Sequence, residues 1–396
     1  MPSENHAAYL IDKHGKPLEV RTAPYTAPGP GELVIKNAAI AINPVDGGVQ
    51  MAGNLMFPYL RYPAIMGSDV SGVVVEVGSA EGGQPSPFQP GDRVVGHAIG
   101  IDKRSNKAAE TAFQEYTVLR AHLTSKIPDD LSHERACVLP LGLSTAACGL
   151  FMKNYLALRR PTLKPKLGPE VGARTSQDAV EGTSGEEART DVVVVWGAST
   201  SVGSNAVQLA CAAGYEVIAT ASPKNFEYVK SLGASRVLDC KELDTVPRIV
   251  QALQGKTCAG ALAIGTGSLE ACIDIVSAVP GRKFVSQASN PIDMSEMPTG
   301  AVGLIGLVLK LLWWNISTAF KARFKGVSTK FIWGSDVIVD EIGPVIYNDY
   351  LPQGLASGQF QAKPDPRVVG TGLESVQEAI NTSVKGVSAA KVVVTL

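Results

Sequence analysis

A glycine-bearing turn, Gly197-Ala-Ser-Thr-Ser-Val-Gly203, has the residue types and spacing to bind a phosphate group. Four valines, 192–195, precede it, and a helical pattern with apolar residues on one face follows it. A turn with few large side chains lets backbone N–H groups and the N-terminus of the next helix approach an anion closely. The predicted contacts with a pyrophosphate are Gly197, Ser199, Thr200, Ser201, Val202 and Gly203.

A second β-branched run, 217–220, follows that helix, so strand, turn, helix and strand occupy about thirty residues, the layout of a dinucleotide-binding unit. Units that prefer NAD usually carry a carboxylate at the end of the second strand. Here Ser222, Lys224 and Asn225 supply a hydroxyl, a cation and an amide, which suit the 2′-phosphate that a carboxylate would repel. The sequence therefore predicts NADP(H), although an ordinary capped helix start would show the same residues.

Two unlike regions must position these residues. Residues 6–119 hold short strands separated by turns rich in glycine and proline, which favours a partly open barrel. From 132 the pattern becomes helical, with a break at Pro140, and 157–190 lacks periodicity, which predicts an extended loop. Six strands alternating with helices then predict a doubly wound parallel sheet, and the last strand, 391–396, is expected to rejoin the first region.

Composition limits the class of protein. The chain has 396 residues, 45% of them hydrophobic, and a formal net charge of −1, so it is long enough for two domains and has no basic surplus for nucleic acid. Its six cysteines are scattered, which argues against a disulfide framework and a structural zinc site. The first residues show no basic-then-apolar signal region, which predicts a cytoplasmic protein.

The most apolar run is 300–314, GAVGLIGLVLKLLWW. It is short for a bilayer span and Lys310 interrupts it, so no span is expected. A buried or pocket-covering helix is the favoured interpretation, and a subunit interface or a peripheral membrane contact is the alternative.

Seven stretches, in order and spacing, resemble the medium-chain dehydrogenase/reductase superfamily, in its zinc-independent quinone reductase and fungal trans-acting enoyl reductase branch. They are Asn43-Pro-Val-Asp46, Gly67-Ser-Asp-Val-Ser-Gly72, Gly91-Asp-Arg-Val94, Leu141-Gly-Leu-Ser-Thr145, Gly197…Gly203, Ser222-Pro-Lys-Asn225 with Leu232-Gly-Ala234, and Lys391-Val-Val-Val394.

The resemblance implies a split chain. Residues 1–145 would form the first part of a GroES-like, barrel-type catalytic domain, 146–335 an NADP-binding Rossmann domain carrying the 157–190 loop, and 336–396 the return to the catalytic domain. It also implies a small-molecule substrate and usually a homodimer, though some fungal relatives are monomers. An accessory role beside a larger synthase is a further alternative.

The resemblance further implies site residues. Asn43 would donate a hydrogen bond to the substrate carbonyl, although an Asn-Pro turn is the alternative. Thr145 would lie beside the nicotinamide, unless its hydroxyl only caps a helix. Further cofactor contacts are implied at Pro44, Gly265, Ser286 and Lys391.

No metal is expected. The zinc-dependent relatives carry a cysteine and a His-Glu pair where this chain has Pro44 or Val45 and Ser68-Asp69. Zinc needs three or four converging soft or borderline ligands, and those positions do not offer them.

Four positions depart from the family pattern. The glycine turn carries Thr200 and Ser201 where glycines are usual, Gly48 replaces a lysine, and Cys240 replaces a tyrosine. A site without cofactor is the alternative to phosphate binding by the two hydroxyls. Tyr59 could supply a phenolic proton, although its stretch MFPYLRYP also fits an ordinary aromatic loop.

The expected activity is NADPH-dependent, zinc-independent reduction of an activated C=C bond in an enone, a quinone or an enoyl thioester. Two alternatives stay open: a zinc-free NADP-dependent alcohol dehydrogenase or carbonyl reductase, and a non-catalytic NADPH-binding accessory protein.

Overall fold

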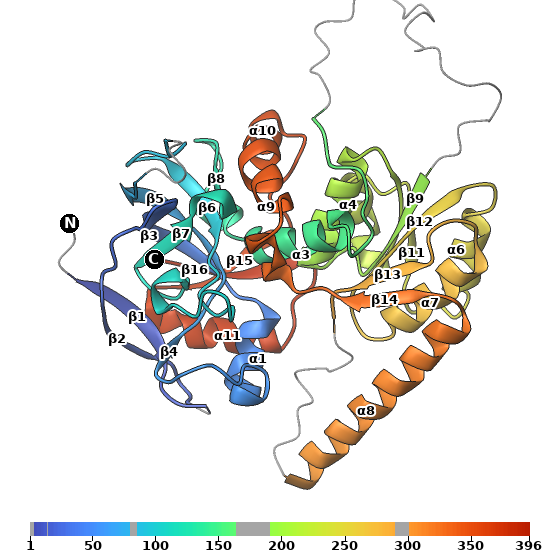
Figure 1. Cartoon of the computed structure of the whole chain (residues 1–396), viewed down its shortest axis with the longest axis horizontal. Helices are drawn as coiled ribbons and strands as arrows, with labels where there is room; N and C mark the ends of the chain where they lie inside the picture. The colour runs from blue at the N-terminus through green and yellow to red at the C-terminus, as the bar shows by residue number, and fades with distance from the viewer. Residues whose placement is uncertain (1–3, 14, 80–84, 164–190, 290–300) are drawn as a thin grey trace, which may run out of the picture.

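The computed structural model describes residues 4–13, 15–79, 85–163, 191–289 and 301–396. Figure 1 shows two sheet-containing regions with helix α3 (Pro140–Phe151) between them. One region is built from a single stretch of chain, and the other from residues near both ends.

The single-stretch region is a six-stranded sheet in the order β11-β10-β9-β12-β13-β14, and every neighbouring pair is parallel. Numbered along the chain, the order is 3-2-1-4-5-6, that of the Rossmann fold. The strands are β9 (Asp191–Trp196), β10 (Glu216–Ala221), β11 (Arg236–Asp239), β12 (Thr257–Ala263), β13 (Phe284–Gln287) and β14 (Ser328–Phe331). The doubly wound sheet is confirmed.

Helices cover both faces of this sheet, because its central strand is apolar on both. Val193 and Val195 pack into one core cluster, and Val192 and Val194 into another. All four are fully buried, as a strand between two helical layers requires. The helices are α4 (Ser201–Ala212), α5 (Phe226–Ser231), α6 (Thr245–Ala252), α7 (Ser268–Ala278) and α8 (Ala301–Phe324).

The other region holds a seven-stranded sheet in the order β15-β16-β3-β5-β6-β8, with β7 paired to β3, and a three-stranded sheet, β2-β1-β4. The strands are β1 (Asn5–Leu10), β2 (Glu19–Ala23), β3 (Glu32–Ala41), β4 (Ala64–Ile65), β5 (Asp69–Val77), β6 (Arg93–His97), β7 (Tyr116–Arg120), β8 (Thr124–Lys126), β15 (Asp365–Thr371) and β16 (Ala390–Thr395). Its helices include α1 (Pro44–Ala52), α2 (His133–Ala136) and α11 (Val376–Val384).

The last strand returns to the first region, as predicted. Strand β16 runs antiparallel to β3, with Val393 opposite Ala41. After β14 the chain passes through the 3-10 turn η6 (Gly334–Ile338), α9 (Ile342–Pro344), η7 (Val345–Tyr350) and α10 (Leu351–Ser357) before it enters β15.

Helix α3 joins the two regions because glycines let its neighbours approach. A Cβ at Gly142 would lie 2.5 Å from Ser201 Oγ on α4, and one at Gly149 would lie 2.5 Å from Ile332 Cδ1 after β14. Small residues on both sides of α3 thus let the start of α4 and the chain after β14 pack against one helix.

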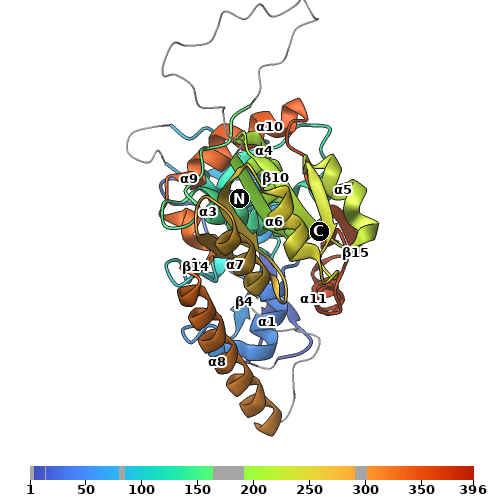
Figure 2. The same cartoon turned by 90° about the vertical axis from the view of Figure 1, so that its right-hand side faces the viewer.

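Two sequence expectations concern the surface. Of the predicted 157–190 loop, 157–163 contain no helix or strand, and 164–190 lie outside the described residues. From 301 onward the apolar run forms α8, as predicted. Of the favoured interpretation, a buried or pocket-covering helix, the buried form is wrong and the pocket-covering form stays a prediction. The helix runs along the outside of the molecule in both views (Figures 1 and 2), and many of its large apolar side chains are exposed. No helix in the described part of the chain is long and apolar enough to cross a membrane.

Candidate functional site

The turn after β9 has the backbone of a phosphate-binding turn. Gly197 has a φ of +81°, and its N–H donates to Thr220 Oγ1 at 3.1 Å. A Cβ at Gly203 would overlap the carbonyl oxygen of Gly197, so only glycine lets α4 start this close to β9. The N-terminus of α4 lies beside the point where the strand order reverses, which is where open α/β sheets bind ligands.

Thr200 acts as the cap of α4. Its hydroxyl accepts from the Gly203 N–H at 3.0 Å and donates to the Gly197 carbonyl at 2.8 Å. Ser201 Oγ donates to the Val138 carbonyl at 3.4 Å. Both predicted phosphate donors therefore have intramolecular acceptors, while the N–H groups of the first turn, among them that of Val202, have no acceptor within the helix.

The predicted 2′-phosphate pocket follows β10. Ser222 is half-buried and Lys224 is exposed. Asn225 is buried, and its side-chain Nδ2 donates to Ser388 Oγ at 3.2 Å. An exposed cation therefore lies just after β10, and no carboxylate occurs from Ala221 to Asn225. The Asn225 bond connects the start of α5 to the loop before β16.

The next two predicted cofactor contacts differ in exposure: one lies at an open position after β12, and the other is buried in β13. Gly265, after β12, has a φ of +96°, and a Cβ there would meet nothing within 4 Å, so the site opens beside it. Ser286 is fully buried in β13, and its hydroxyl donates to the Gly149 carbonyl at 2.8 Å. That side chain holds the sheet against α3, and no cofactor contact is proposed for it.

Asn43 follows β3 and precedes α1, where Pro44 begins the helix and is exposed. Its side chain is buried, and its Oδ1 accepts a hydrogen bond from Lys391 Nζ of β16. Its Nδ2 has no hydrogen-bond partner among the described residues. Because the lysine can only donate, it fixes which end of the amide is oxygen and leaves the N–H₂ group available.

Lys391 is itself held by an ion pair. Its Nζ lies 2.9 Å from Asp69 Oδ2, with 5% and 0% of the two side chains exposed. Asp69 Oδ1 accepts from the Leu141 N–H at the start of α3, at 2.6 Å. The predicted cofactor contact of Lys391 therefore belongs to a buried network that reaches α3.

Helix α3 carries two further polar side chains of this area, Ser144 and Thr145. Thr145 is 8% exposed, and its hydroxyl donates to the Leu141 carbonyl at 2.7 Å. Gly334 of η6 lies against it, since a Cβ there would overlap Thr145 Oγ1. The capping alternative is wrong, because Thr145 lies inside α3 and its hydroxyl bonds a carbonyl one turn earlier. Its place beside the nicotinamide stays a prediction.

A buried chain of hydrogen bonds lies behind Thr145, and sequence reasoning missed it. His97 Nδ1 is 2.9 Å from Ser144 Oγ, which is 2.8 Å from the Tyr347 hydroxyl. The tyrosine donates to the Pro140 carbonyl at 2.9 Å. Burial lowers the pKa of His97 to about 4, so the imidazole is neutral at physiological pH. No spacing in the sequence links these three residues, since they come from β6, α3 and η7.

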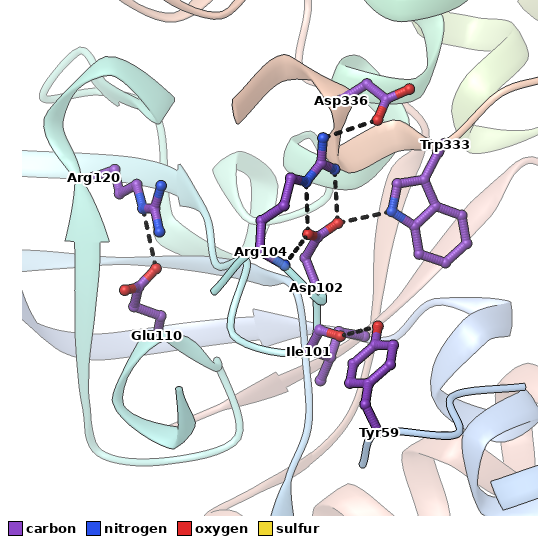
Figure 3. Close-up of polar contacts among 8 residues, drawn as sticks. All are labelled: Tyr59, Ile101, Asp102, Arg104, Glu110, Arg120, Trp333 and Asp336. Carbon is purple, nitrogen blue, oxygen red and sulfur yellow. Dashed lines mark hydrogen bonds and ion pairs between the residues drawn. The ribbon is translucent and has the colours of Figure 1, made fainter. Parts of the chain in front are cut away.

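Tyr59 lies in the loop after α1, with its hydroxyl directed at the backbone (Figure 3). It donates to the Ile101 carbonyl at 2.9 Å, and its ring packs on Phe57, which in turn packs on Trp333. Burial raises the pKa of Tyr59, with the charge of Asp102 acting in the same direction. The hydroxyl therefore stays protonated at neutral pH.

Asp102 joins the two regions beside that aromatic group. Its carboxylate accepts two hydrogen bonds from the Arg104 guanidinium and one from the Arg104 backbone N–H, each at 2.8 Å. It accepts another from Trp333 Nε1 at 2.8 Å. Arg104 also contacts Asp336 at 3.0 Å (Figure 3). Burial alone would raise the pKa of Asp102, but these donors lower it below the ordinary value. A second pair, Glu110 with Arg120, lies away from this junction in the same view.

Replacing Arg104 with leucine is expected to lower the free energy of unfolding by about 3 kcal/mol, because it leaves the buried Asp102 carboxylate without its charged partner. Asp336→Asn, which removes only the partly exposed partner, should cost less than about 1 kcal/mol. Urea unfolding of both variants measures the difference. Equal losses would show that Asp102 does not depend on Arg104.

Asp46 in α1 gives a pH-dependent stability. Its carboxylate accepts from the Asn43 N–H at 2.7 Å, yet burial raises its pKa to about 7. Because the unfolded pKa is about 4, the folded state binds more protons in between, so stability falls as pH rises from about 4 to 7. In Asp46→Asn this loss disappears. The unfolding free energy of the variant, minus that of the natural chain, should therefore rise by a few kcal/mol from pH 5 to pH 8. Parallel curves would contradict this assignment.

In the described ranges, no group of three or more His, Cys, Asp or Glu side chains could hold a metal ion. The cation nearest to Asn43 and Asp69 is the ammonium group of Lys391.

Comparisons with known proteins agree with this architecture. Residues 29–129 match the alcohol dehydrogenase GroES-like domain. The chain is 45% identical over its whole length to all of dehydrogenase pigH from Monascus ruber. It is 35% identical to trans-enoyl reductase himH from Aspergillus japonicus, across 98% of this chain and 97% of that one. A quinone oxidoreductase structure from Pseudomonas syringae superposes with a TM-score of 0.64 at 22% identity, covering 99% of this chain and 100% of that one. The chain therefore belongs to the medium-chain dehydrogenase/reductase superfamily, in a group with fungal dehydrogenases and trans-enoyl reductases.

Proposed function

We propose that the protein reduces a C=C bond conjugated to a carbonyl group, with NADPH as its cofactor. The observation that carries this proposal is the Asn43 amide, whose oxygen is held by Lys391 while its N–H₂ group has no partner among the described residues. A relative named as a trans-enoyl reductase, 35% identical over nearly the whole chain, supports the same class of reaction.

The chemistry needs a hydrogen-bond donor where negative charge develops. When NADPH is bound it supplies a hydride for the β-carbon, which leaves charge on the carbonyl oxygen of the substrate. A preorganised, buried N–H group stabilises such an oxygen more strongly than water does. Asn43 is proposed as that donor. Lys391 is proposed as the positioning residue, because its bond to Oδ1 prevents a flip of the amide that would exchange its oxygen and nitrogen.

The α-carbon of the substrate must then gain a proton. Tyr59 is the proposed source, since burial raises its pKa and keeps the phenol protonated. To donate, its hydroxyl must turn away from the Ile101 carbonyl, which it contacts at 2.9 Å.

Cofactor binding is proposed at the turn after β9 and the end of β10. Gly203 lets α4 start close against β9, Gly265 leaves the edge of the sheet open, and the first turn of α4 presents N–H groups to a pyrophosphate. The preference for NADPH is assigned to Ser222 and the exposed Lys224. Their hydroxyl and ammonium groups suit a phosphate.

Independence from zinc is part of the proposal. Near Asn43, an ammonium group neutralises the buried Asp69, and the amide supplies the electrophilic contact that a Lewis acid would otherwise provide. Negative charge on the substrate oxygen would then be stabilised by hydrogen-bond donors of the chain alone.

A panel of substrates separates this proposal from its alternatives. Purified protein and NADPH are offered enones, quinones, enoyl thioesters and aldehydes while NADPH absorbance is followed. We expect turnover of at least one conjugated C=C substrate or quinone. Turnover of aldehydes alone would instead indicate a carbonyl reductase, in which the same Asn43 donor polarises a ketone or aldehyde. Tight NADPH binding without any turnover would indicate an accessory protein.

A further inference from the structure

Helix α8 presents a continuous row of large apolar side chains to solvent. Ile305, Leu309, Trp313, Ile316 and Phe320 recur at intervals of three or four residues and are 61–74% exposed. Val308, Leu312 and Phe324 extend the same row, with 46, 54 and 84% exposed. Residues at this spacing share one side of a helix.

The opposite side of α8 makes the polar contacts. Trp314 Nε1 donates to Glu270 at 2.6 Å, and Lys321 and Lys325 both contact Asp274 of α7, at 2.7 and 2.6 Å. A surface helix of a globular protein usually packs its apolar face inward and leaves its polar face outside. In α8 the side with the polar contacts packs against α7, and the apolar row faces solvent.

The size of the row argues that it is a binding surface. Exposed aromatic and aliphatic side chains of this number amount to on the order of 1,000 Å², whereas the largest apolar patch on a typical monomer is about 300–600 Å². Figures 1 and 2 both show α8 at the periphery, extending away from the sheet, so a flat partner could reach it along its length.

Charge indicates the kind of partner. From 301 to 325 the chain has four basic residues, Lys310, Lys321, Arg323 and Lys325, and no aspartate or glutamate. Lys310 and Arg323 are exposed and form no ion pair within the described residues. Leucine, tryptophan and phenylalanine beside unpaired cations are the composition of helices that lie in the surface of anionic membranes.

We infer that α8 is a membrane-surface helix that docks the protein on anionic lipid. The apolar row would enter the boundary between headgroups and acyl chains, and Lys310 and Arg323 would contact lipid phosphates or carboxylates. A second copy fits the charges less well, because α8 packed against another α8 would bring only cations together.

Sedimentation of the full chain with phosphatidylcholine vesicles, with and without phosphatidylserine, tests the inference. We expect binding that requires phosphatidylserine, weakens with salt and shifts tryptophan emission to the blue. The triple variant Trp313→Gln, Ile316→Ser, Phe320→Ser should bind at least about tenfold more weakly, since each apolar side chain contributes to insertion. Lys310→Gln with Arg323→Gln should lower binding to the anionic vesicles about tenfold.

Matched control variants distinguish binding through α8 from nonspecific adsorption to vesicles. Leu243→Ser removes an apolar side chain that is fully exposed elsewhere, and Lys36→Gln removes an exposed cation of the other sheet; both should bind as the natural chain does. All changes are at exposed positions, and unchanged thermal unfolding verifies that the variants fold. Failure to sediment with either vesicle, equal binding to neutral vesicles, or an unaffected triple variant would overturn the inference. A dimer that the triple variant dissociates, without vesicle binding, would assign the row to a second copy.

Discussion

Replacing Asn43 with alanine is expected to lower kcat/KM for a conjugated substrate about 10²- to 10³-fold, the loss seen when one preorganised donor to a developing oxyanion is removed. The effect should fall on kcat, because the donor acts as charge develops and contributes little before that. Binding of NADPH, followed by fluorescence titration, should stay unchanged, since the turn after β9 is built from other residues.

Two companion variants make this prediction specific. Asn43→Asp keeps an oxygen for Lys391 but has no N–H group, so it should be as inactive as Asn43→Ala. Lys391→Met removes the group that orients the amide and also leaves the buried Asp69 without its cationic partner, so it should lose both activity and stability. An Asn43→Asp variant with normal kcat would overturn the donor role, whatever the alanine variant does.

Replacing Lys224 with glutamate is expected to weaken NADPH binding on the order of 100-fold, because a charge-assisted contact is lost and a repulsive charge is introduced. Binding of NADH should change little, since it lacks the 2′-phosphate. The ratio of the two dissociation constants is the measurement, and it is independent of any substrate.

A lysine on the other sheet provides a control with the same change of charge. Lys36 is exposed in β3, so Lys36→Glu alters the net charge without touching the end of β10. Its NADPH affinity should match that of the natural chain. If Lys224→Glu weakens NADH and NADPH equally, the residue does not recognise the 2′-phosphate.

Local sequence patterns were sufficient to predict the first elements of the Rossmann sheet. Four consecutive valines, the spacing from Gly197 to Gly203 and a second β-branched run predicted β9, α4 and β10, because each feature acts over a few residues. The helix break at Pro140 and the return of the last strand were also predicted and are confirmed.

Contacts between distant residues could not be predicted. Nothing near Lys391 indicates that it bonds Asn43, and nothing near Ser144 indicates His97 and Tyr347 as partners. The short edge strand β14 was not located, since its four residues carry little pattern. The exposure of α8 was only the alternative interpretation, because a mainly apolar helix usually lies in a core and composition alone does not show which face stays uncovered.

The bond between Lys391 and Asn43 joins residues 348 positions apart. Asn43 lies at the start of α1, in the first part of the chain, yet the lysine that orients its amide comes into place only when β16 pairs with β3. Contacts this distant in sequence form late, because closing a long loop costs entropy before the contact can repay it. We therefore expect the oriented amide to appear late in folding, after the Rossmann sheet between the two residues has formed.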